Sequence, residues 1–422
     1  MSTHRKSYVL PMIIIAALFF ALGFVTWVNG TLIPYLKIAC ELESDLQSFL
    51  VVTAFFIAYA VMSIPSSFVL RGTGYKKGMA LALFIMAFGA ILFIPAAQAR
   101  NFDLFLIGLF IIGTGSALLQ TAVNPYASII GPIESAAMRI SIMGVCNKFA
   151  GILAGLIFGA IALNDADALV QSLKTMDVVA KNAKLDELAS RVIIPYMIIA
   201  GVLIVLAVSI LLSGLPDIKD DGEDIASTDA IPASAGKTSI FQFPHLLLGV
   251  LAIFLYVGVE VMAGDTIISY GKSLHIDLSI ARYFTQGTLI FMLIGYFVGI
   301  FAIPKYLSQQ NALKWCAILG VVFTTLAVVT TGYVSVGFIA ALGLANSLMW
   351  PAIFPLAING LGKFIKIGSA LLVMAIAGGA ILPLIYGKLA LYSSLQHAYL
   401  MMIPCYIFIW YFAIKGHRIG KA

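Results

Sequence analysis

The sequence predicts an all-α membrane protein with twelve transmembrane helices in two six-helix bundles. Of its 422 residues, 61% are hydrophobic and only 10% are charged, whereas a soluble domain carries roughly 25% charged residues. The apolar residues come in runs of about 20, the length of helix that crosses a bilayer core of roughly 30 Å. A transmembrane β-barrel would instead show alternating segments of about ten residues. The chain is therefore expected to cross a membrane many times as helices.

Twelve apolar runs can be placed along the chain. They lie at approximately 9–36, 46–70, 79–98, 103–128, 138–163, 192–213, 245–268, 283–303, 313–331, 334–358, 367–388 and 397–415. The first of them is too long for the apolar core of a signal peptide and lacks a convincing cleavage site. We expect it to be the first spanning helix.

A polar segment, residues 215–244, separates the first six runs from the last six. It contains DIKDDGEDIASTDAIPASAGK, which is acidic, then rich in Ser, Ala and Pro, and has no apolar periodicity. Such a composition is typical of a flexible linker. We therefore expect an N-terminal bundle at residues 1–214 and a C-terminal bundle at residues 245–422.

The two halves share a short repeat. QTAVNP, which begins at Gln120, aligns with WPAIFP, which begins at Trp350, at an offset of 230 residues. Both have Ala in the third place and Pro in the last. Together with the central linker and the six-plus-six count, this repeat indicates a duplication of the parallel kind known in transporters.

The basic residues predict the orientation. With the N-terminus inside, fifteen Lys and Arg fall on the inner side and nine on the outer side, four of the nine within one long loop at residues 164–191. Basic residues favour cytoplasmic loops, so we expect both termini and the linker in the cytoplasm. The net charge of +6 is small and dispersed, and it indicates no nucleic-acid partner.

Polar side chains within the apolar runs predict a binding cavity, because a polar group in hydrocarbon costs free energy unless it is satisfied. The candidates for substrate binding are Gln120, Asn124, Asn147, Asn29, Trp350, Asn346 and Glu260. Gln120 and Asn124 are four residues apart and share a helix face. Amides both donate and accept hydrogen bonds, which suits the hydroxyls of a sugar. The alternative is that these amides join neighbouring helices.

Three ionisable residues within the runs are candidates for coupling: Lys148, Glu260 and Asp265. A charge at mid-membrane costs roughly 2.5–3.5 kcal/mol on insertion scales and is seldom without a role. Glu260 is a proton or cation site, a sugar ligand or the partner of Lys148; the sequence does not decide whether the two touch. Three roles are open for Lys148: its charge replaces a coupling cation, its ammonium gains and loses a proton, or it forms a structural ion pair with Glu260. Asp265 lies nearer the outer end and is either a coupling site or a solvated residue.

Other functional classes receive less support. The five histidines lie at the ends of runs or in loops, and no metal cluster or nucleophile–base pair falls within the runs. There is also no Gly-rich phosphate loop of the Walker type. We therefore expect no enzyme, no metal site and no cofactor beyond a coupling H⁺ or Na⁺. A drug exporter of the same fold and a nutrient sensor are the remaining rivals.

Several motifs resemble one transporter family. The turn from Ser67 to Lys77 resembles the loop pattern of the major facilitator superfamily. LQTAVNPY, FFALGFVTWVNGTLIPYLK, YVGVEVMAGD and LGLANSLMWPAIFPLAINGLGKF resemble its fucose–proton symporter family, especially the glucose/galactose branch and carriers of Bacteroidetes-type bacteria. The resemblance covers nearly the whole chain except the linker and the outer loop.

The resemblance implies a major facilitator fold and a multi-pass sugar carrier of a bacterial inner membrane. The expected function is symport of a neutral hexose, of glucose, galactose or mannose type, by alternating access coupled to H⁺ or Na⁺. The alternatives are a fucose or N-acetylglucosamine carrier, or an uncoupled sugar uniporter in which Lys148 replaces the coupling cation. We expect a monomer whose partners are the sugar and the bilayer.

This chain departs from the fucose carriers at the positions that matter for coupling. Those carriers have acidic residues in the first and fourth spans, where this chain has Gly30 and Gln120. Asn147 matches the family's fifth-span Asn, but Lys148 beside it departs from the fucose members. The coupling mechanism of the fucose carriers therefore cannot be carried over to this chain.

Overall fold

A computed structural model describes residues 9–129, 136–215, 238–303 and 305–420. All regular elements in these residues are helices. The first half contains α1 (Val9–Trp27), α2 (Asn29–Ala39), α3 (Asp45–Ser48), α4 (Leu50–Ile91), α5 (Phe93–Gln98), α6 (Phe102–Ile129), α7 (Ala136–Ala162), α8 (Ala166–Leu173), α9 (Val178–Ser190) and α10 (Ile193–Leu212).

The second half begins with a short 3₁₀ turn and continues through the C-terminal helices. It contains η2 (Ile240–Gln242), α11 (Pro244–Asp265), α12 (Ile267–Ser273), α13 (Leu278–Ala281), α14 (Phe284–Ala302), α15 (Gln309–Val329), α16 (Gly332–Asn346), α17 (Met349–Ile358), η3 (Gly362–Phe364), α18 (Ile365–Met374), η4 (Ala375–Ala377), α19 (Gly378–Tyr392), α20 (Leu395–Ala398), η5 (Tyr399–Met401), α21 (Met402–Ile414) and η6 (Gly416–Arg418).

Eleven helical segments in the described residues are long and apolar enough to cross a membrane. One of them, Asp45–Gln98, has 54 residues, and a helix of that length would measure about 80 Å, far more than one crossing needs. Gly74 interrupts it with a φ of 75°, a backbone conformation that favours glycine. Divided there, the segment holds two of the twelve expected spans, 46–70 and 79–98.

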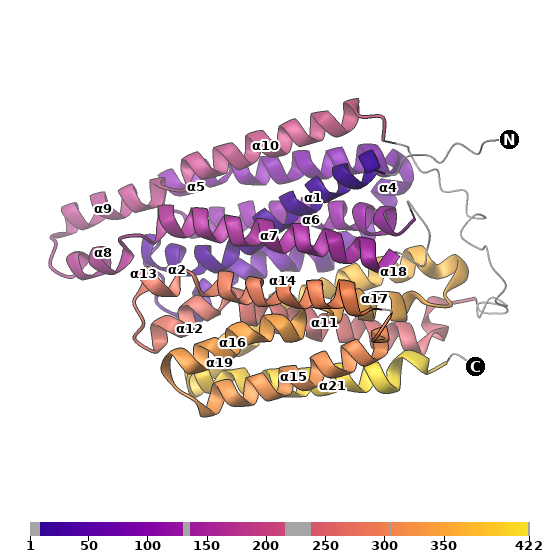
Figure 1. Cartoon of the computed structure of the whole chain (residues 1–422). Coiled ribbons are helices and arrows are strands. Elements are labelled where there is room, and N and C mark those ends of the chain that lie inside the picture. The colour runs from indigo at the N-terminus through magenta and orange to yellow at the C-terminus, as the bar shows by residue number, and fades with distance from the viewer. Residues whose placement is uncertain (1–8, 130–135, 216–237, 304, 421–422) are drawn as a thin grey trace.

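The helices form two groups that lie side by side. Figure 1 shows α1–α10 in one group and α11–α21 in the other. Across the seam between them, α7 packs against α14, and α4 packs against α18 and α19. Helices α8 and α9 extend from one end of the molecule, which we call the α9 end. The described chain starts and stops at the opposite end, which we call the terminal end.

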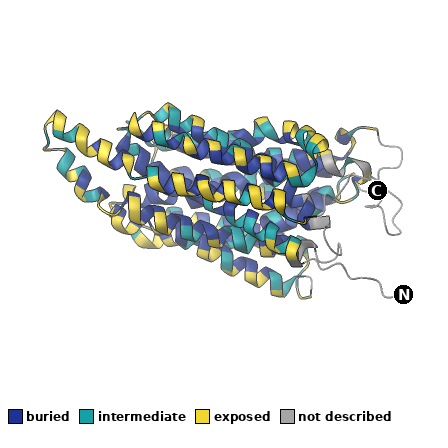
Figure 2. Cartoon of the chain, turned by 90° about the horizontal axis from the view of Figure 1, so that it is seen from above, coloured by how far each residue is buried: buried dark blue, intermediate teal, exposed yellow. Residues whose placement is uncertain are grey.

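The surface along the sides of the molecule is apolar. On α10, Ile194, Val205 and Leu212 are each more than 60% exposed, and exposed residues follow the outward faces of the helices in Figure 2. A soluble protein buries such a stripe, whereas lipid covers it in a membrane helix. The chain is a multi-pass membrane protein.

Two expected features can be compared with the structure only in part. The outer loop at 164–191 forms the helices α8 and α9, which bury Leu169, Leu185 and Leu188 and leave Val178 and Val179 exposed. Most of the expected linker at 215–244, namely residues 216–237, lies outside the described residues, as do Arg5 and Lys6. The division into bundles at 1–214 and 245–422 stays a prediction.

Candidate functional site

A cavity lies between the two groups of helices, and six of the predicted site residues line it. They are Gln120 and Asn124 from α6, Asn147 and Lys148 from α7, Glu260 from α11 and Trp350 from α17. The cavity measures about 110 Å³, below the roughly 300 Å³ at which small-molecule pockets begin. Side chains around it must therefore move before it holds a molecule the size of a sugar.

Helix α6 contributes an amide face to the cavity. Gln120 and Asn124 stand one turn apart on this helix, and both line the cavity. Gln120 Nε2 donates a hydrogen bond to Tyr59 Oη of α4 at 2.9 Å, which fixes the direction of the amide. The arrangement leaves the Gln120 carbonyl oxygen as an acceptor available to a ligand.

Lys148 and Glu260 form an ion pair across the seam. Lys148 Nζ lies 2.9 Å from Glu260 Oε1, and the two side chains are only 8% and 10% exposed. The ammonium also lies 4.2 Å from the centre of the Trp27 ring, within the range of a cation–π contact. The two charges therefore neutralise each other in the cavity wall, where either one alone would be costly.

Asn147 is held by helix α1 in this conformation. Its Oδ1 accepts a hydrogen bond from Trp27 Nε1 at 3.2 Å, and its Nδ2 donates to the carbonyl oxygen of Phe19 at 3.3 Å. Both polar atoms of the amide thus have protein partners, although the side chain lines the cavity. These contacts favour the interhelical role that the sequence left open.

Trp350 supplies an aromatic wall from the second half. Its ring stacks on Phe354, one turn further along α17, with ring centroids 5.6 Å apart and an interplanar angle of 26°. Pro351, next to Trp350, also lines the cavity. The ring is partly exposed, so an apolar face of a ligand can pack against it.

Three predicted residues lie outside the cavity lining. Asn346 is fully buried and accepts a hydrogen bond from Tyr406 Oη at 2.9 Å, so it joins α16 to α21. Asn29 is fully buried on α2, and its amide has no hydrogen-bond partner among the described residues. Asp265 is 1% exposed at the end of α11, which rules out a solvated carboxylate in this conformation.

Sequence reasoning missed two tyrosines of the cavity wall. Tyr256 stands one turn before Glu260 on α11, and this spacing was a usable signal. Tyr296, on α14, gave no such signal because the residues within one helical turn of it on either side are all apolar or glycine. Its ring requires Gly144 on α7, where an added Cβ would lie 2.9 Å from the Tyr296 ring.

The described residues contain no group of three or more His, Cys, Asp or Glu side chains able to hold a metal ion. What the cavity offers is hydrogen bonding from amides and tyrosines, aromatic surface and one neutralised ion pair. Such groups are chemically able to hydrogen-bond and orient a polar, uncharged molecule. They include no nucleophile positioned beside a base.

Three comparisons place the chain among known proteins. The sequence profile of the Major Facilitator Superfamily matches residues 15–382. The glucose/galactose transporter of Brucella abortus biovar 1 (strain 9-941) is 34% identical, over 99% of this chain and 96% of that protein. The L-fucose-proton symporter of Escherichia coli (strain K12) is 29% identical, over 97% and 94%. The crystal structure of the transporter FucP in the outward conformation superposes with a TM-score of 0.75 at 28% identity, covering 97% of this chain and 99% of that one.

Proposed function

Because this chain belongs to the Major Facilitator Superfamily, a superfamily of transporters and not of enzymes, we propose that it carries a neutral hexose of glucose, galactose or mannose type. The observation that carries the proposal is the cavity, which gathers amides, tyrosines and two tryptophans, Trp27 and Trp350, from the two halves. The names of the relatives, a glucose/galactose transporter and a fucose symporter, agree with this class of substrate.

The chemistry of the wall suits a monosaccharide. Gln120 and Asn124 offer donors and acceptors on one side, and each sugar hydroxyl both donates and accepts. Trp350 offers a flat surface for the C–H face of the ring. A wholly apolar substrate would leave the amides unpaired, at about 1–3 kcal/mol for each buried polar group. A charged substrate would find Lys148 and Glu260 already paired with each other.

Transport proceeds by alternating access between the two halves. In the present conformation several polar contacts join the halves at the α9 end. Lys272 Nζ lies 2.5 Å from Asp167 Oδ1, and Arg282 donates hydrogen bonds to Asn164 Oδ1 at 2.9 Å and to the Gly159 carbonyl at 3.2 Å. These contacts close the α9 end. We propose that both termini lie in the cytoplasm of a bacterium, so that this closed end faces the periplasmic side of the inner membrane.

The ion pair supports a second candidate, an uncoupled uniporter. Lys148 places an ammonium against Glu260, in the position that a bound cation would take beside this carboxylate. A carrier whose own lysine supplies this positive charge does not need to bind a cation from solution at Glu260. Coupling to H⁺ or Na⁺ then depends on another group.

Uptake of radiolabelled sugars into proteoliposomes tests the proposal. The panel contains glucose, galactose, mannose, fucose and N-acetylglucosamine, each with an imposed proton gradient, an imposed sodium gradient or neither. We expect counterflow of at least one of the first three sugars without any gradient. Transport of fucose or N-acetylglucosamine alone would replace the proposed hexose with that sugar. No transport of any of the five sugars would overturn the proposal.

A further inference from the structure

The carboxylate of Asp265 fills the space that a side chain at position 30 would take. Gly30 lies on α2 in the first half, and Asp265 ends α11 in the second half. A Cβ added at Gly30 would lie 3.2 Å from Asp265 Oδ1 and 2.9 Å from Thr285 Oγ1. The absence of a side chain on α2 is what lets this carboxylate reach the seam.

Asp265 forms no ion pair among the described residues, and the backbone N–H of Gly30 faces its carboxylate only at poor hydrogen-bond geometry. Its side chain is 1% exposed, and neither oxygen has a hydrogen-bond partner of normal geometry among the described residues. Thr285 Oγ1 donates its hydrogen to the Gly264 carbonyl at 2.7 Å and so does not serve the carboxylate. Glu260, one turn earlier on α11, is different because Lys148 neutralises it.

The surroundings favour the neutral acid. The charged groups that act on Asp265 are Glu260 from its own helix and Lys148 from α7, and these two neutralise each other. Helix α2 presents Gly30, and α14 presents Thr285. An ionised carboxylate buried without a partner costs several kcal/mol. A metal cation would need several oxygen ligands around it, whereas a proton needs no additional space.

We propose that Asp265 is the proton-binding residue of the transport cycle, an inference that rests on the proposed function. While α2 covers Asp265 and the α9 end is closed, the Asp265 side chain keeps its proton. When α2 and α11 separate, water reaches the acid; the O–H bond breaks, the proton passes to water and the carboxylate remains. Before the halves close again, the carboxylate must take up a proton from water, because burying its charged form in the seam is costly. Movement of the halves is thereby linked to uptake and release of one proton.

Infrared spectroscopy of the purified, membrane-reconstituted protein tests the proposal without relying on transport. We expect a carbonyl-stretch band of a protonated carboxyl group at neutral pH in the parent. Asp265→Asn should lose this band, and Asp265→Glu should retain one shifted in frequency. The control is the double variant Lys148→Ala with Glu260→Gln, which removes both members of the neighbouring ion pair and should keep the band. A band that survives Asp265→Asn and disappears in the double variant would overturn the proposal.

Transport provides the second measurement. In Asp265→Asn, sugar counterflow should continue while the stimulation of uptake by a pH gradient is lost, whereas Asp265→Glu should keep part of that stimulation. A pH response in Asp265→Asn equal to that of the parent would overturn the proposal. If the parent carries no sugar but the infrared band still depends on Asp265, the hexose proposal fails and the proton site stands.

Discussion

Lys148 Nζ and Glu260 Oε1 lie 2.9 Å apart across the seam between the two halves. The residues are 112 positions apart in the chain, and each belongs to a different group of helices. The pair therefore exists only when the halves meet at the cavity. It places a fixed positive charge beside one of the two buried carboxylates of α11. The other, Asp265, has no ion-pair partner among the described residues.

We predict that Lys148→Ala changes coupling more than sugar affinity. Without the ammonium, Glu260 is a second unpaired buried carboxylate and must bind a proton or a cation to remain in the seam. Sugar uptake should therefore depend more steeply on an imposed proton or sodium gradient, while sugar binding persists. Uptake under each gradient separately and equilibrium sugar binding are the measurements.

The same change should also lower stability, since removing one partner of a buried pair costs about 3–5 kcal/mol. The double variant Lys148→Ala with Glu260→Gln should recover part of this loss in thermal unfolding. Lys388→Ala, an exposed lysine of α19, is the control for loss of a positive charge. Gradient dependence identical to the parent would show that Lys148 is structural.

Gln120→Ala should weaken sugar binding. The substitution removes one amide from the cavity wall, and one hydrogen bond contributes about 1 kcal/mol, which corresponds to roughly fivefold in Kd. Tyr59→Phe should have a smaller effect because it removes only the group that orients the Gln120 amide. Gln171→Ala, at an exposed position of α8, is the matched control. Equal Kd values for Gln120→Ala and Gln171→Ala would exclude Gln120 from the site.

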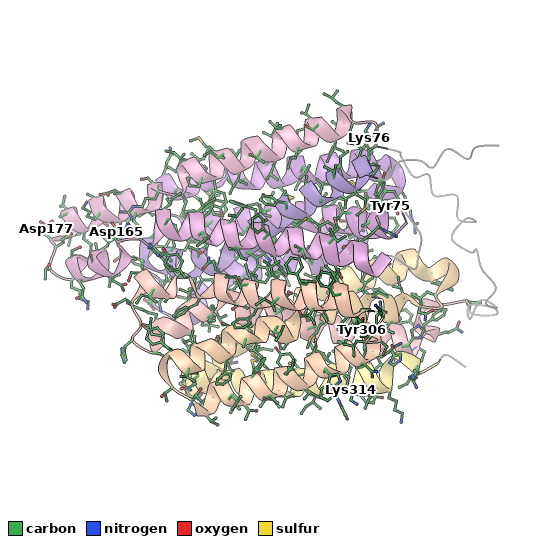
Figure 3. All side chains as sticks on the ribbon, in the orientation of Figure 1. Tyr75, Lys76, Asp165, Asp177, Tyr306 and Lys314 are labelled. Atoms are coloured by element: carbon green, nitrogen blue, oxygen red, sulfur yellow. The ribbon has the colours of Figure 1, made fainter. Side chains whose placement is uncertain are left out.

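The α9 end should face the periplasm and the terminal end the cytoplasm. Figure 3 places Asp165 and Asp177 at the α9 end, and Tyr75, Lys76 and Lys314 toward the terminal end. The predicted count of fifteen Lys and Arg on the terminal side against nine on the α9 side agrees with the rule that basic residues favour the cytoplasm.

Cysteine labelling in intact cells measures this orientation. Val179→Cys, at a position 80% exposed on α9, should react with a membrane-impermeant maleimide. Tyr306→Cys, 76% exposed, should react only after permeabilisation. The background lacks the four native cysteines, since Cys40 is partly exposed. The reverse pattern of labelling would invert the topology.

Gly378→Ala should destabilise the second half. An added Cβ at Gly378 would lie 1.8 Å from the backbone oxygen of Phe254, so α11 and α19 must move apart, and such overpacking costs about 1–3 kcal/mol. Gly201→Ala on α10 is the control, because no atom lies within 4 Å of its added Cβ. Thermal unfolding of both variants in detergent measures the difference. A midpoint lowered equally in both would show that the close contact is not the cause.

The sequence predicts the spans well because each has to match the thickness of the bilayer. The expected fourth span, 103–128, corresponds to α6 at Phe102–Ile129. The breaks between α1 and α2 at Val28, and between α11 and α12 at Thr266, were not predicted. The apolar pattern runs through both breaks and therefore does not encode them.

The candidate site was predictable to the same degree. A polar residue in a span turns away from lipid, and this alone brings Gln120, Asn124 and Glu260 to the interior. It does not distinguish a cavity wall from a bond between helices. Asn346 accepts a hydrogen bond from Tyr406 and does not line the cavity, yet in the sequence it is, like Asn124, an amide within an apolar run. Likewise, only the assembled seam reveals that Gly30 and Asp265 meet.

The contact of Asp167 with Lys272 should act as a latch for the α9 end. Asp167 lies in the first turn of α8, and its Oδ2 also accepts a hydrogen bond from the backbone N–H of Ser279 at 3.2 Å. One side chain thus holds two points of the opposite half. Asp167→Asn removes the charge that binds the Lys272 ammonium, so the equilibrium should shift toward the state that is open at this end.

Spin labels at Gln171→Cys and Tyr333→Cys, in a background without native cysteines, report on this shift. Gln171 lies on α8 of the first half, and Tyr333 begins α16 of the second half, where it is 60% exposed. In Asp167→Asn the populated distance between the labels should increase. Asp177→Asn is the matched control, because Asp177 accepts only from the Ala180 N–H of its own helix among the contacts of the described residues, and Asn can also cap a helix. If both variants give the parent distance distribution, the Asp167 contact does not hold the end closed, and the remaining contacts of Arg282 with Asn164 and Gly159 become the bonds to break.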